Sequence, residues 1–294
     1  MTDFLLRPDA DDLSQNSSYY GGTAPSSGTT NRLLIMESGV PVTKGLTTGL
    51  NLNQVVIGPN VRKKIGQNGE AMSISVNNGT DPKFIHMGAG GPAHALYLTG
   101  TIPQLEMGLA AQAFVTGGNL GADVVTVGGG CRLQVGSSAV LGASAGNTGT
   151  IRVQPGGVAV LDEYTGGTDR AGVVSVASGA SLLTARTVAD LTIAARGVAE
   201  LLEAATISDG SSGGTCEMYG GLLRVRTRAG ITIDSLTGLA GRLDPAGMGG
   251  ALTISAGFVD RSSFDLPEMH SAGAVTFSGT EVGDPSMLNA ILGS

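Results

Sequence analysis

The sequence predicts an all-β fold, a single-stranded parallel β-helix (solenoid) with an extended N-terminal arm and a short C-terminal capping helix. The main observation behind this prediction is a recurring six-residue phrase, apolar–x–apolar–x–x–glycine. Composition agrees with it, because 48 of the 294 residues are glycine, more than double the usual share of about 7%. Hydrophobic residues make up 41% of the chain and tryptophan is absent, so a narrow core of small aliphatic side chains is expected.

The six-residue phrase is typical of a strand followed by a turn. Its two-residue apolar period indicates a strand with one buried face, and its glycine suits a backbone that bends out of the strand region. Four copies end at Gly130, Gly156, Gly179 and Gly257, and a further copy, Leu191-Thr-Ile193, has Arg196 in the glycine position. The spacings 156 − 130 = 26, 179 − 156 = 23 and 196 − 179 = 17 favour a solenoid over a globular sandwich.

The pattern divides the chain into four segments. Residues 1–31 are rich in Ser, Thr, Asn, Gly and Asp, and we expect an extended low-complexity arm that becomes ordered on a partner. Residues 32–80 contain short strand candidates and are predicted to be a small β-rich attachment region. Residues 81–283 form the predicted β-helix body, and residues 284–294 the predicted capping helix, in which Pro285 suits the first helical position.

Charge and hydropathy limit the partners that the chain can have. The net charge is −7, and residues 81–294 hold 11 basic and 18 acidic side chains, so the body would repel a phosphate backbone and nucleic-acid binding is not expected. No apolar run approaches the roughly 18 residues of a membrane span, and the acidic N-terminus does not resemble a signal peptide. We therefore expect synthesis in a host cytoplasm without export by the general route, and no membrane partner.

Catalytic and metal-binding residues are not indicated. Cys131 and Cys216 replace apolar residues in strand-like stretches and are interpreted as buried free thiols. His86 and His94 lack the companion spacing of a metal site, and no cofactor is expected. No Gly-x-Ser-x-Gly elbow or phosphate-binding loop is present.

Paired carboxylates are the remaining candidates for an active site, because glycoside hydrolysis uses two carboxyl groups about 5–10 Å apart. Three pairs are close in sequence, but the chain has only five Tyr and six Phe to serve as sugar platforms. Solvated acidic faces explain these residues more simply, so the sequence predicts a non-enzymatic protein. The pairs are Asp162 with Glu163, Glu200 with Glu203, and Asp260 with Asp265.

One tight basic run, Arg62-Lys63-Lys64, follows the strand candidate at residues 55–57. Its plain interpretation is a solvated turn. The alternative is a docking patch that steers the protein toward an acidic partner surface. These three residues are the candidate partner contacts of the sequence.

Residues 95–283 resemble parallel β-helix proteins. The stretches Ile151-Arg-Val-Gln-Pro-Gly-Gly-Val-Ala-Val-Leu161 and Val174-Ser-Val-Ala-Ser-Gly-Ala-Ser-Leu-Leu183 are similar to phrases in tailspike-type phage proteins and in autotransporter passenger domains. Some tailspike-like β-helices of phages serve as capsid decoration or cement proteins rather than as enzymes. No catalytic motif is carried over by the resemblance.

The resemblance implies three functions in decreasing order of expectation. The first is a virion structural protein, a decoration or cement protein on the capsid exterior of a tailed phage, bound to the major capsid protein through its N-terminal region. The second is a receptor-binding tailspike or fibre that binds or cleaves a host surface polysaccharide, and the third is an autotransporter-type adhesin. β-Helix phage proteins are often trimeric, so a homotrimer is expected ahead of a dimer.

Overall fold

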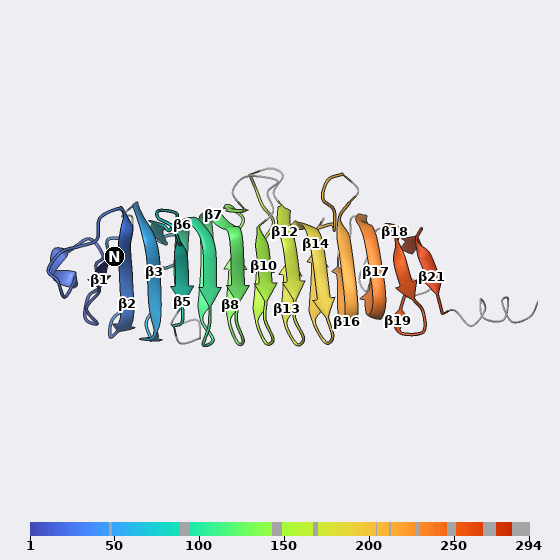
Figure 1. Ribbon diagram of the computed structural model, residues 1–294, viewed down its shortest axis with the longest axis horizontal. Helices are drawn as coiled ribbons and strands as arrows, with labels where there is room; N and C mark the ends of the chain where they lie inside the picture. Colours follow the sequence, from blue (N-terminus) through green and yellow to red (C-terminus); the bar gives the residue numbers. More distant parts are fainter. Residues whose placement is uncertain are drawn as a thin grey trace, which may run out of the picture.

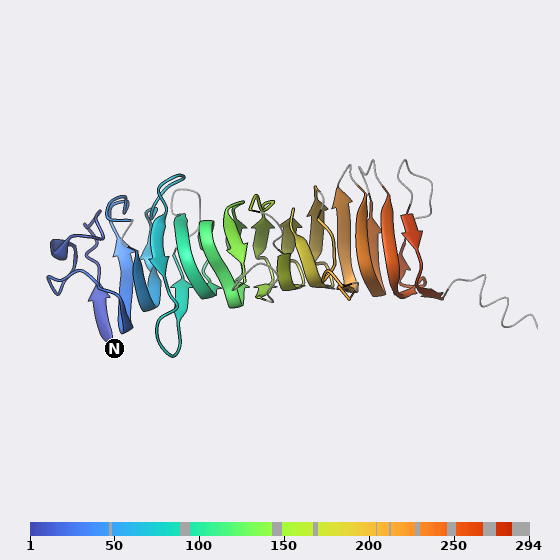
Figure 2. The ribbon, with the colours of Figure 1, turned by 90° about the horizontal axis from the view of Figure 1, so that it is seen from above.

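The protein is an elongated parallel β-solenoid of about ten turns with almost no helix, as seen in a computed structural model (Figure 1). The chain advances along the rod from β1 at one end to β21 at the other, and a view turned by 90° shows the same succession (Figure 2). The structure describes residues 1–46, 49–88, 95–142, 149–166, 170–203, 205–211, 213–226, 230–245, 251–266 and 275–283.

The strands differ in length, and the long ones pair with more than one strand of the next turn, as β7 does with β8, β9 and β10. One short 3-10 helix, η1 (Asn16–Ser18), lies within the described residues. The strands are β1 (Thr2–Leu5), β2 (Gly28–Ser38), β3 (Leu50–Val61), β4 (Met72–Ser75), β5 (Lys83–His86), β6 (Leu96–Met107), β7 (Gln112–Val127), β8 (Arg132–Val135), β9 (Ala139–Leu141), β10 (Thr150–Val153), β11 (Val158–Leu161), β12 (Arg170–Val176), β13 (Ser181–Thr184), β14 (Thr187–Ala194), β15 (Val198–Leu202), β16 (Thr215–Arg226), β17 (Ile231–Asp244), β18 (Leu252–Asp260), β19 (Phe264–Asp265), β20 (Val275–Phe277) and β21 (Thr280–Val282).

The repeated phrase sets the register of the solenoid. Val125 of β7 pairs with Ile151 of β10, which pairs with Val174 of β12, which pairs with Leu191 of β14. All these pairings are parallel. Each copy of the phrase therefore lies directly on the next, and the prediction of a parallel β-helix from the spacing is confirmed.

Inward side chains stack in continuous apolar rows along the rod. On the side that contains β10 and β12, one row begins at Phe4 and is continued by buried side chains through Leu236, and every neighbour in it differs by one turn. Stacked strands lie about 4.8 Å apart, so apolar side chains one turn apart can pack against each other. The row is Phe4, Leu33, Val55, Phe84, Leu105, Val125, Ile151, Val174, Leu191, Cys216 and Leu236.

The glycine of the phrase lies at a left-handed corner. Gly156 and Gly179 have φ of 77° and 71°, and the amide of Gly156 donates to the carbonyl of Gly179 on the next turn. Arg196 occupies the same position one turn later with φ of 61°. The interpretation of the glycines as corners rather than ligand loops is therefore confirmed for Gly130, Gly156 and Gly179, whereas Gly257 lies within β18 opposite Leu236.

The N-terminal residues are not an extended arm, which corrects the expectation for residues 1–31. β1 pairs with β2, with Phe4 opposite Leu33, and so belongs to the first turn. The following segment folds over the end of the rod: Leu6 and Tyr19 form an antiparallel bridge, both are buried, and the Tyr19 hydroxyl donates to the Leu13 carbonyl at 2.9 Å. A few apolar side chains among many polar ones are enough to cover a narrow solenoid end, because little area needs covering.

The predicted attachment region at residues 32–80 belongs to the same rod. Leu33 of β2 pairs with Val55 of β3, and Val55 pairs with Phe84 of β5, so the sheet continues without a break past residue 81. The predicted capping helix at residues 284–294 lies outside the described residues. Within the described part of the chain, no helix is long and apolar enough to cross a membrane.

Candidate functional site

A buried arginine interrupts the apolar interior at the middle of the rod. Arg186 follows β13 and is 2% exposed. Its guanidinium donates to three backbone carbonyls at 2.7 Å each, from Nε to Asp162, from Nη1 to Ala139 and from Nη2 to Gly136. A buried charge is tolerated only where its donors are satisfied, so this side chain fixes two neighbouring segments of backbone.

Thr184 helps to position Arg186. It lies in an inward row between Leu161 and Leu201 and is fully buried. Its hydroxyl donates to the Arg186 carbonyl at 2.8 Å and accepts from the Arg186 amide at 3.0 Å. The ring of Tyr164 lies 5.4 Å from the guanidinium carbon, a cation–π contact. Thr184 and Arg186 thus form a hydrogen-bonded polar pair inside the otherwise apolar interior.

Beside the backbone that Arg186 holds, the surface is hollowed into a groove of about 280 Å³, which we call the lateral groove. It crosses several turns of the solenoid, and two of its lining residues, Gly136 and Asp162, are those whose carbonyls Arg186 holds. The lining residues are Asn68, Tyr97, Phe114, Val115, Thr116, Gln134, Gly136 and Asp162.

Two aromatic rings form one end of the lateral groove. Tyr97 of β6 and Phe114 of β7 are register partners, and their rings are stacked with centroids 4.9 Å apart and planes 13° apart. Gln134 of β8 is the next register partner of Phe114. Phe114 therefore lies in the register between Tyr97 on one side and Gln134 on the other.

Polar groups form the other end. Gln134 Nε2 donates to Asp162 Oδ2 at 3.0 Å, which holds the carboxylate beside the amide. Gly136 contributes no side chain, so the floor beside them is backbone. The Thr116 hydroxyl donates to the Leu98 carbonyl at 3.3 Å and completes the wall. The groove thus joins an aromatic surface to fixed hydrogen-bonding groups.

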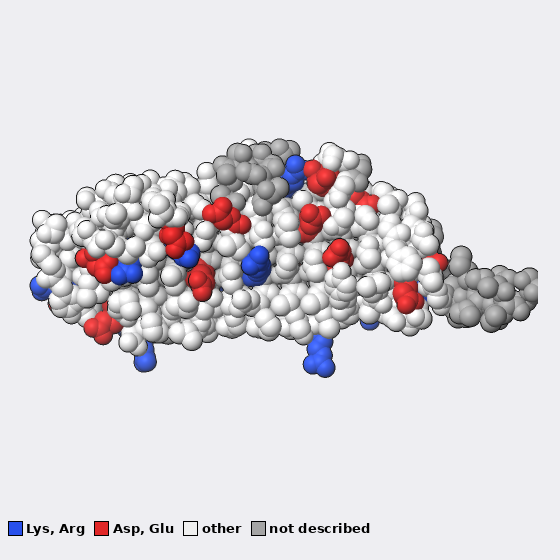
Figure 3. Space-filling view, viewed as in Figure 1, with Lys and Arg blue, Asp and Glu red and all other residues white. Residues whose placement is uncertain are grey.

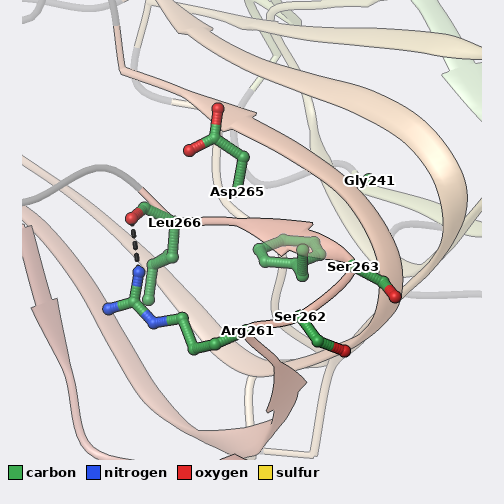
Figure 4. Close-up of a pocket in the computed structure, with 7 residues that line it drawn as sticks. Gly241, Arg261, Ser262, Ser263, Asp265 and Leu266 are labelled. Carbon is green, nitrogen blue, oxygen red and sulfur yellow. Dashed lines mark hydrogen bonds between the residues drawn. The ribbon is translucent and has the colours of Figure 1, made fainter. Parts of the chain in front are cut away.

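A second pocket, of about 530 Å³, lies at the turn after β18 (Figure 4). Arg261 faces the Leu266 carbonyl, to which Nη1 donates at 2.5 Å, and its Nε donates to Glu281 Oε2 at 2.9 Å. Asp265 is turned away from Arg261 and has Arg242 as its partner at 3.4 Å. The charged groups here are already paired within the chain, so the lateral groove is the stronger candidate site.

The sequence-predicted basic residues lie just past the end of β3. Arg62 and Lys63 are exposed, and Lys64 is half-buried with Nζ donating to Gln67 Oε1 at 3.3 Å. They do not line the lateral groove or the second pocket. Charged side chains on the face seen in Figure 3 are distributed singly or in small groups of both signs.

Glu200, Asp260 and Asp162, one from each carboxylate pair, have different partners. Glu200 binds Arg226 at 3.0 Å, and Asp260 accepts from the amide and hydroxyl of Ser262 at 2.9 and 2.6 Å, which holds the pKa of Asp260 below its usual range. Asp162 belongs to the lateral groove. Within the described residues, no group of three His, Cys, Asp or Glu side chains could hold a metal ion.

The histidine and cysteines of the sequence lie inside the rod. His86 is 1% exposed, its Nε2 is 3.0 Å from the Gln112 carbonyl, and burial lowers its pKa to about 4. Cys131 and Cys216 are buried free thiols, as predicted, and burial raises the pKa of both. His94 and His270 lie outside the described residues.

The outward surface changes character along the rod. One row of register partners faces out from β1, β2, β3 and β5, and we call it the outer apolar row: Leu5, Leu34, Val56 and Ile85. The same row continues into the next turns as polar residues: Glu106, Thr126, Arg152, Ser175, Thr192 and Glu217. The first four turns therefore differ from the rest on this side.

The chain matches no protein-family model, no curated protein and no solved structure. The structure establishes the fold, an all-β parallel solenoid. A solenoid's repeating surface carries little information by itself, so a specific function is argued from the places where the repeat changes.

Sequence reasoning named Asp162 as one of a carboxylate pair but missed the other residues of the lateral groove and Arg186. A signal for the aromatic pair was available, because Leu96-Tyr-Leu98 and Ala113-Phe-Val115 place an aromatic residue at the outward position of successive strands. Aligning the strands by their inward residues would have stacked the two rings. Arg186 gave no such signal, since a charged residue beside a predicted strand ordinarily faces solvent.

Proposed function

We propose that the protein is a non-enzymatic virion structural protein, a decoration or cement protein on the capsid of a tailed phage. In this proposal it binds the major capsid protein through its N-terminal turns, stabilises the shell and projects the remaining turns outward. The proposal keeps the trimeric state expected from the resemblance. The observation that best supports attachment through the N-terminal turns is the outer apolar row.

The outer apolar row has the composition that is typical of the centre of a protein–protein interface. Leu5, Leu34, Val56 and Ile85 are half-buried in the isolated chain and adjacent on four consecutive strands. Beside them runs a polar row in which Arg32 donates to Asp3 at 2.7 Å. Apolar residues at the centre and charged residues at the edge are the usual arrangement of a protein–protein interface.

The rest of the rod suits a structural role. Its interior rows are apolar over many turns and its corners are held by backbone hydrogen bonds between turns. Because each turn contacts only its neighbours, such a rod gains length without needing a larger core. A covered N-terminal end also limits edge-to-edge association of strands.

A decoration assay tests the proposal. Leu34→Lys combined with Val56→Lys places two charges at the centre of the outer apolar row, and Thr126→Lys combined with Ser175→Lys is the matched control in the polar part of that row. We expect the first pair to lower binding to purified shells of the major capsid protein at least tenfold in co-sedimentation. The control pair should bind as wild type.

Truncation is a poor test, because removing residues 1–60 would take away β1, β2 and most of β3 and open a strand edge. Circular dichroism and melting temperature of the two lysine pairs establish that each is folded. Equal binding of both pairs, or a wild-type protein that binds no shell, would refute attachment through this row.

Arg62 and Lys63 enter the proposal as a steering charge. Both are exposed, whereas Lys64 is engaged with Gln67. Reversing both charges with Arg62→Glu and Lys63→Glu should slow association with an acidic shell surface and reduce its salt dependence, with little effect on dissociation. Unchanged association kinetics would leave these residues as a solvated turn.

A second candidate function is a receptor-binding tailspike or fibre. The lateral groove favours it, because aromatic residues and amides do meet on the surface of this aromatic-poor chain. Binding of a host glycan to particles, rather than of the protein to capsid shells, would distinguish this candidate from the first.

A further inference from the structure

We propose that Asn68 is a site of spontaneous chemical modification, at which the side-chain amide is converted to a carboxylate through a cyclic succinimide. The chain contains two Asn-Gly sequences, Asn68-Gly69 and Asn78-Gly79. Glycine has no Cβ atom, so it leaves its own backbone nitrogen open to the side chain of the preceding asparagine. The fold exposes the first sequence and packs the second against neighbouring turns. The proposal is independent of capsid attachment, because Asn68 does not belong to the outer apolar row.

The reaction consumes one molecule of water and releases one of ammonia. The Gly69 nitrogen gives up its proton to solvent and attacks Cγ of Asn68, which forms a C–N bond and closes the succinimide. The bond between Cγ and Nδ2 breaks, and Nδ2 leaves as ammonia after taking up a proton. Water then opens the ring at Cγ, which gives aspartate, or at the backbone carbonyl carbon, which gives isoaspartate. No atom is oxidised or reduced, so the reaction needs no redox partner.

Asn68 and Gly69 form the tip of a tight turn. Gln67 and Glu70 flank them and exchange both backbone hydrogen bonds at 3.0 Å. Gly69 has φ of 83°, the left-handed conformation that glycine provides in such turns. Both tip residues are exposed, and neither forms a hydrogen bond within the part of the chain that the structure describes. The Asn68 side chain and the Gly69 nitrogen are therefore not held apart by other partners.

The base of this turn is anchored, so the exposure of its tip does not depend on unfolding. Ile65 is 2% exposed, and its amide donates to the Ala95 carbonyl at 3.2 Å. The Gly66 amide donates to the Val42 carbonyl at 2.9 Å. Exposed loop tips are the places where the backbone of a folded protein is most accessible to attack. We therefore expect the reaction to proceed on the folded protein.

The second Asn-Gly sequence is held by neighbouring turns. Asn78 is half-buried, and its backbone amide donates to the Leu52 carbonyl at 3.3 Å. A Cβ atom added at Gly79 would clash with the Asn53 side chain and the backbone of β2, whereas one added at Gly69 would meet nothing within 4 Å. Succinimide closure requires rotation of the asparagine backbone and side chain, so these close contacts oppose it at Asn78.

The product adds a negative charge to two surfaces. Asn68 lines the lateral groove, whose described lining residues include one carboxylate, Asp162, and no Lys or Arg. The segment from Arg62 to Glu70 holds three basic side chains and one acidic side chain, so its net charge falls from +2 to +1. A modification that changes charge acts on partners through ordinary electrostatics. Isoaspartate also lengthens the main chain by one carbon, which disturbs the backbone pairing of Gln67 with Glu70.

The test follows the full chain by peptide mass spectrometry during incubation at physiological pH and temperature in water enriched in oxygen-18. The heavy oxygen marks acid that forms during the incubation, and digestion at mildly acidic pH limits further reaction. We expect Asn68 to deamidate at least tenfold faster than Asn78, and to give both aspartate and isoaspartate.

Concentrated urea provides the matched control, because it removes the fold from both sequences. The two asparagines should then react at rates within threefold of each other. Asn68→Gln should abolish the reaction at this position and leave the rate at Asn78 unchanged, since ring closure from the longer side chain is much slower. Asn68→Asp reproduces the aspartate product and should coelute with it on anion exchange. Circular dichroism establishes that both variants are folded.

Equal rates at the two asparagines of the folded protein would overturn the proposal. So would an Asn68 that keeps its amide in the folded protein over the time in which the unfolded chain reacts. A tenfold difference that persists in urea would assign the selectivity to the local sequence and contradict a role for the turn. None of these results bears on shell binding, so this proposal and capsid attachment fail separately.

Discussion

The Arg186 guanidinium donates a 2.7 Å hydrogen bond from Nη2 to the carbonyl of Gly136, which precedes it by 50 residues. The same side chain donates to the carbonyls of Ala139 and Asp162. One buried side chain thus ties together backbone from three turns of the solenoid. Arg186 thus holds in place the backbone of Gly136 and Asp162, two residues that line the lateral groove.

Arg186→Met should destabilise these turns by about 3 kcal/mol or more, because three carbonyls lose a charged donor in a buried site. Arg186→Lys should recover only part of this loss, since one ammonium group cannot reproduce the planar fork. Urea unfolding gives the overall change, and hydrogen exchange of peptides covering residues 132–142 gives the local one. Unchanged exchange there in Arg186→Met would contradict the assignment.

The corner at Arg196 offers a stabilising substitution. Its φ of 61° is left-handed, a conformation that costs a non-glycine residue about 1–2 kcal/mol, and its side chain is exposed. Arg196→Gly removes this strain but gives the unfolded chain more freedom. We therefore expect a net gain of about 0.5–1 kcal/mol in the free energy of unfolding, measured by urea denaturation.

Gly179→Ala is the matched control for this corner. Gly179 has φ of 71° in the same position one turn earlier, and a Cβ atom added there would meet nothing within 4 Å. Its effect is therefore conformational strain alone, and a loss of about 1 kcal/mol is expected. If Arg196→Gly also destabilises the protein, the corner is not under strain at Arg196.

The interior could be predicted from the sequence because one physical rule repeats. Each copy of the six-residue phrase supplies two inward apolar residues and a corner, so the spacing of 26 residues between Val125 and Ile151 is also their register offset. The N-terminal end could not be predicted in this way. Its burial of Leu6 and Tyr19 depends on a single bridge between residues 13 apart, among residues whose composition is typical of disorder.

The candidate site could be predicted less well than the core. Tyr97 and Phe114 come together only when register is known, and register follows from the inward residues on either side of them. The pairing of Gln134 with Asp162 spans 28 residues and is diagonal across turns, so strand alignment alone does not give it. Predicting side-chain contacts between turns requires the geometry of the corners as well as the apolar pattern of the strands.

His86 predicts a pH dependence of stability. It lies between Ile57 and Met107 in an inward row, and burial lowers its pKa in the folded protein to about 4 from an ordinary value of 6.5. The unfolded chain therefore binds a proton that the folded chain excludes between these values. Stability from this group is complete above about pH 6.5 and is lost as the pH falls toward 4, with a total loss of about 3 kcal/mol.

His86→Gln isolates this effect, because glutamine keeps an N–H donor near the Gln112 carbonyl but does not titrate in this range. Urea unfolding at pH 7.5 and 5.5 stays above the isoelectric point of about 4.9. Between these two pH values, the wild type should lose about 1 kcal/mol more than the variant. Carboxylates whose pKa is lowered, such as Asp260, lose their contribution only at lower pH and affect both proteins equally. Identical pH dependence of the two proteins would mean that His86 is charged or solvated in the folded state.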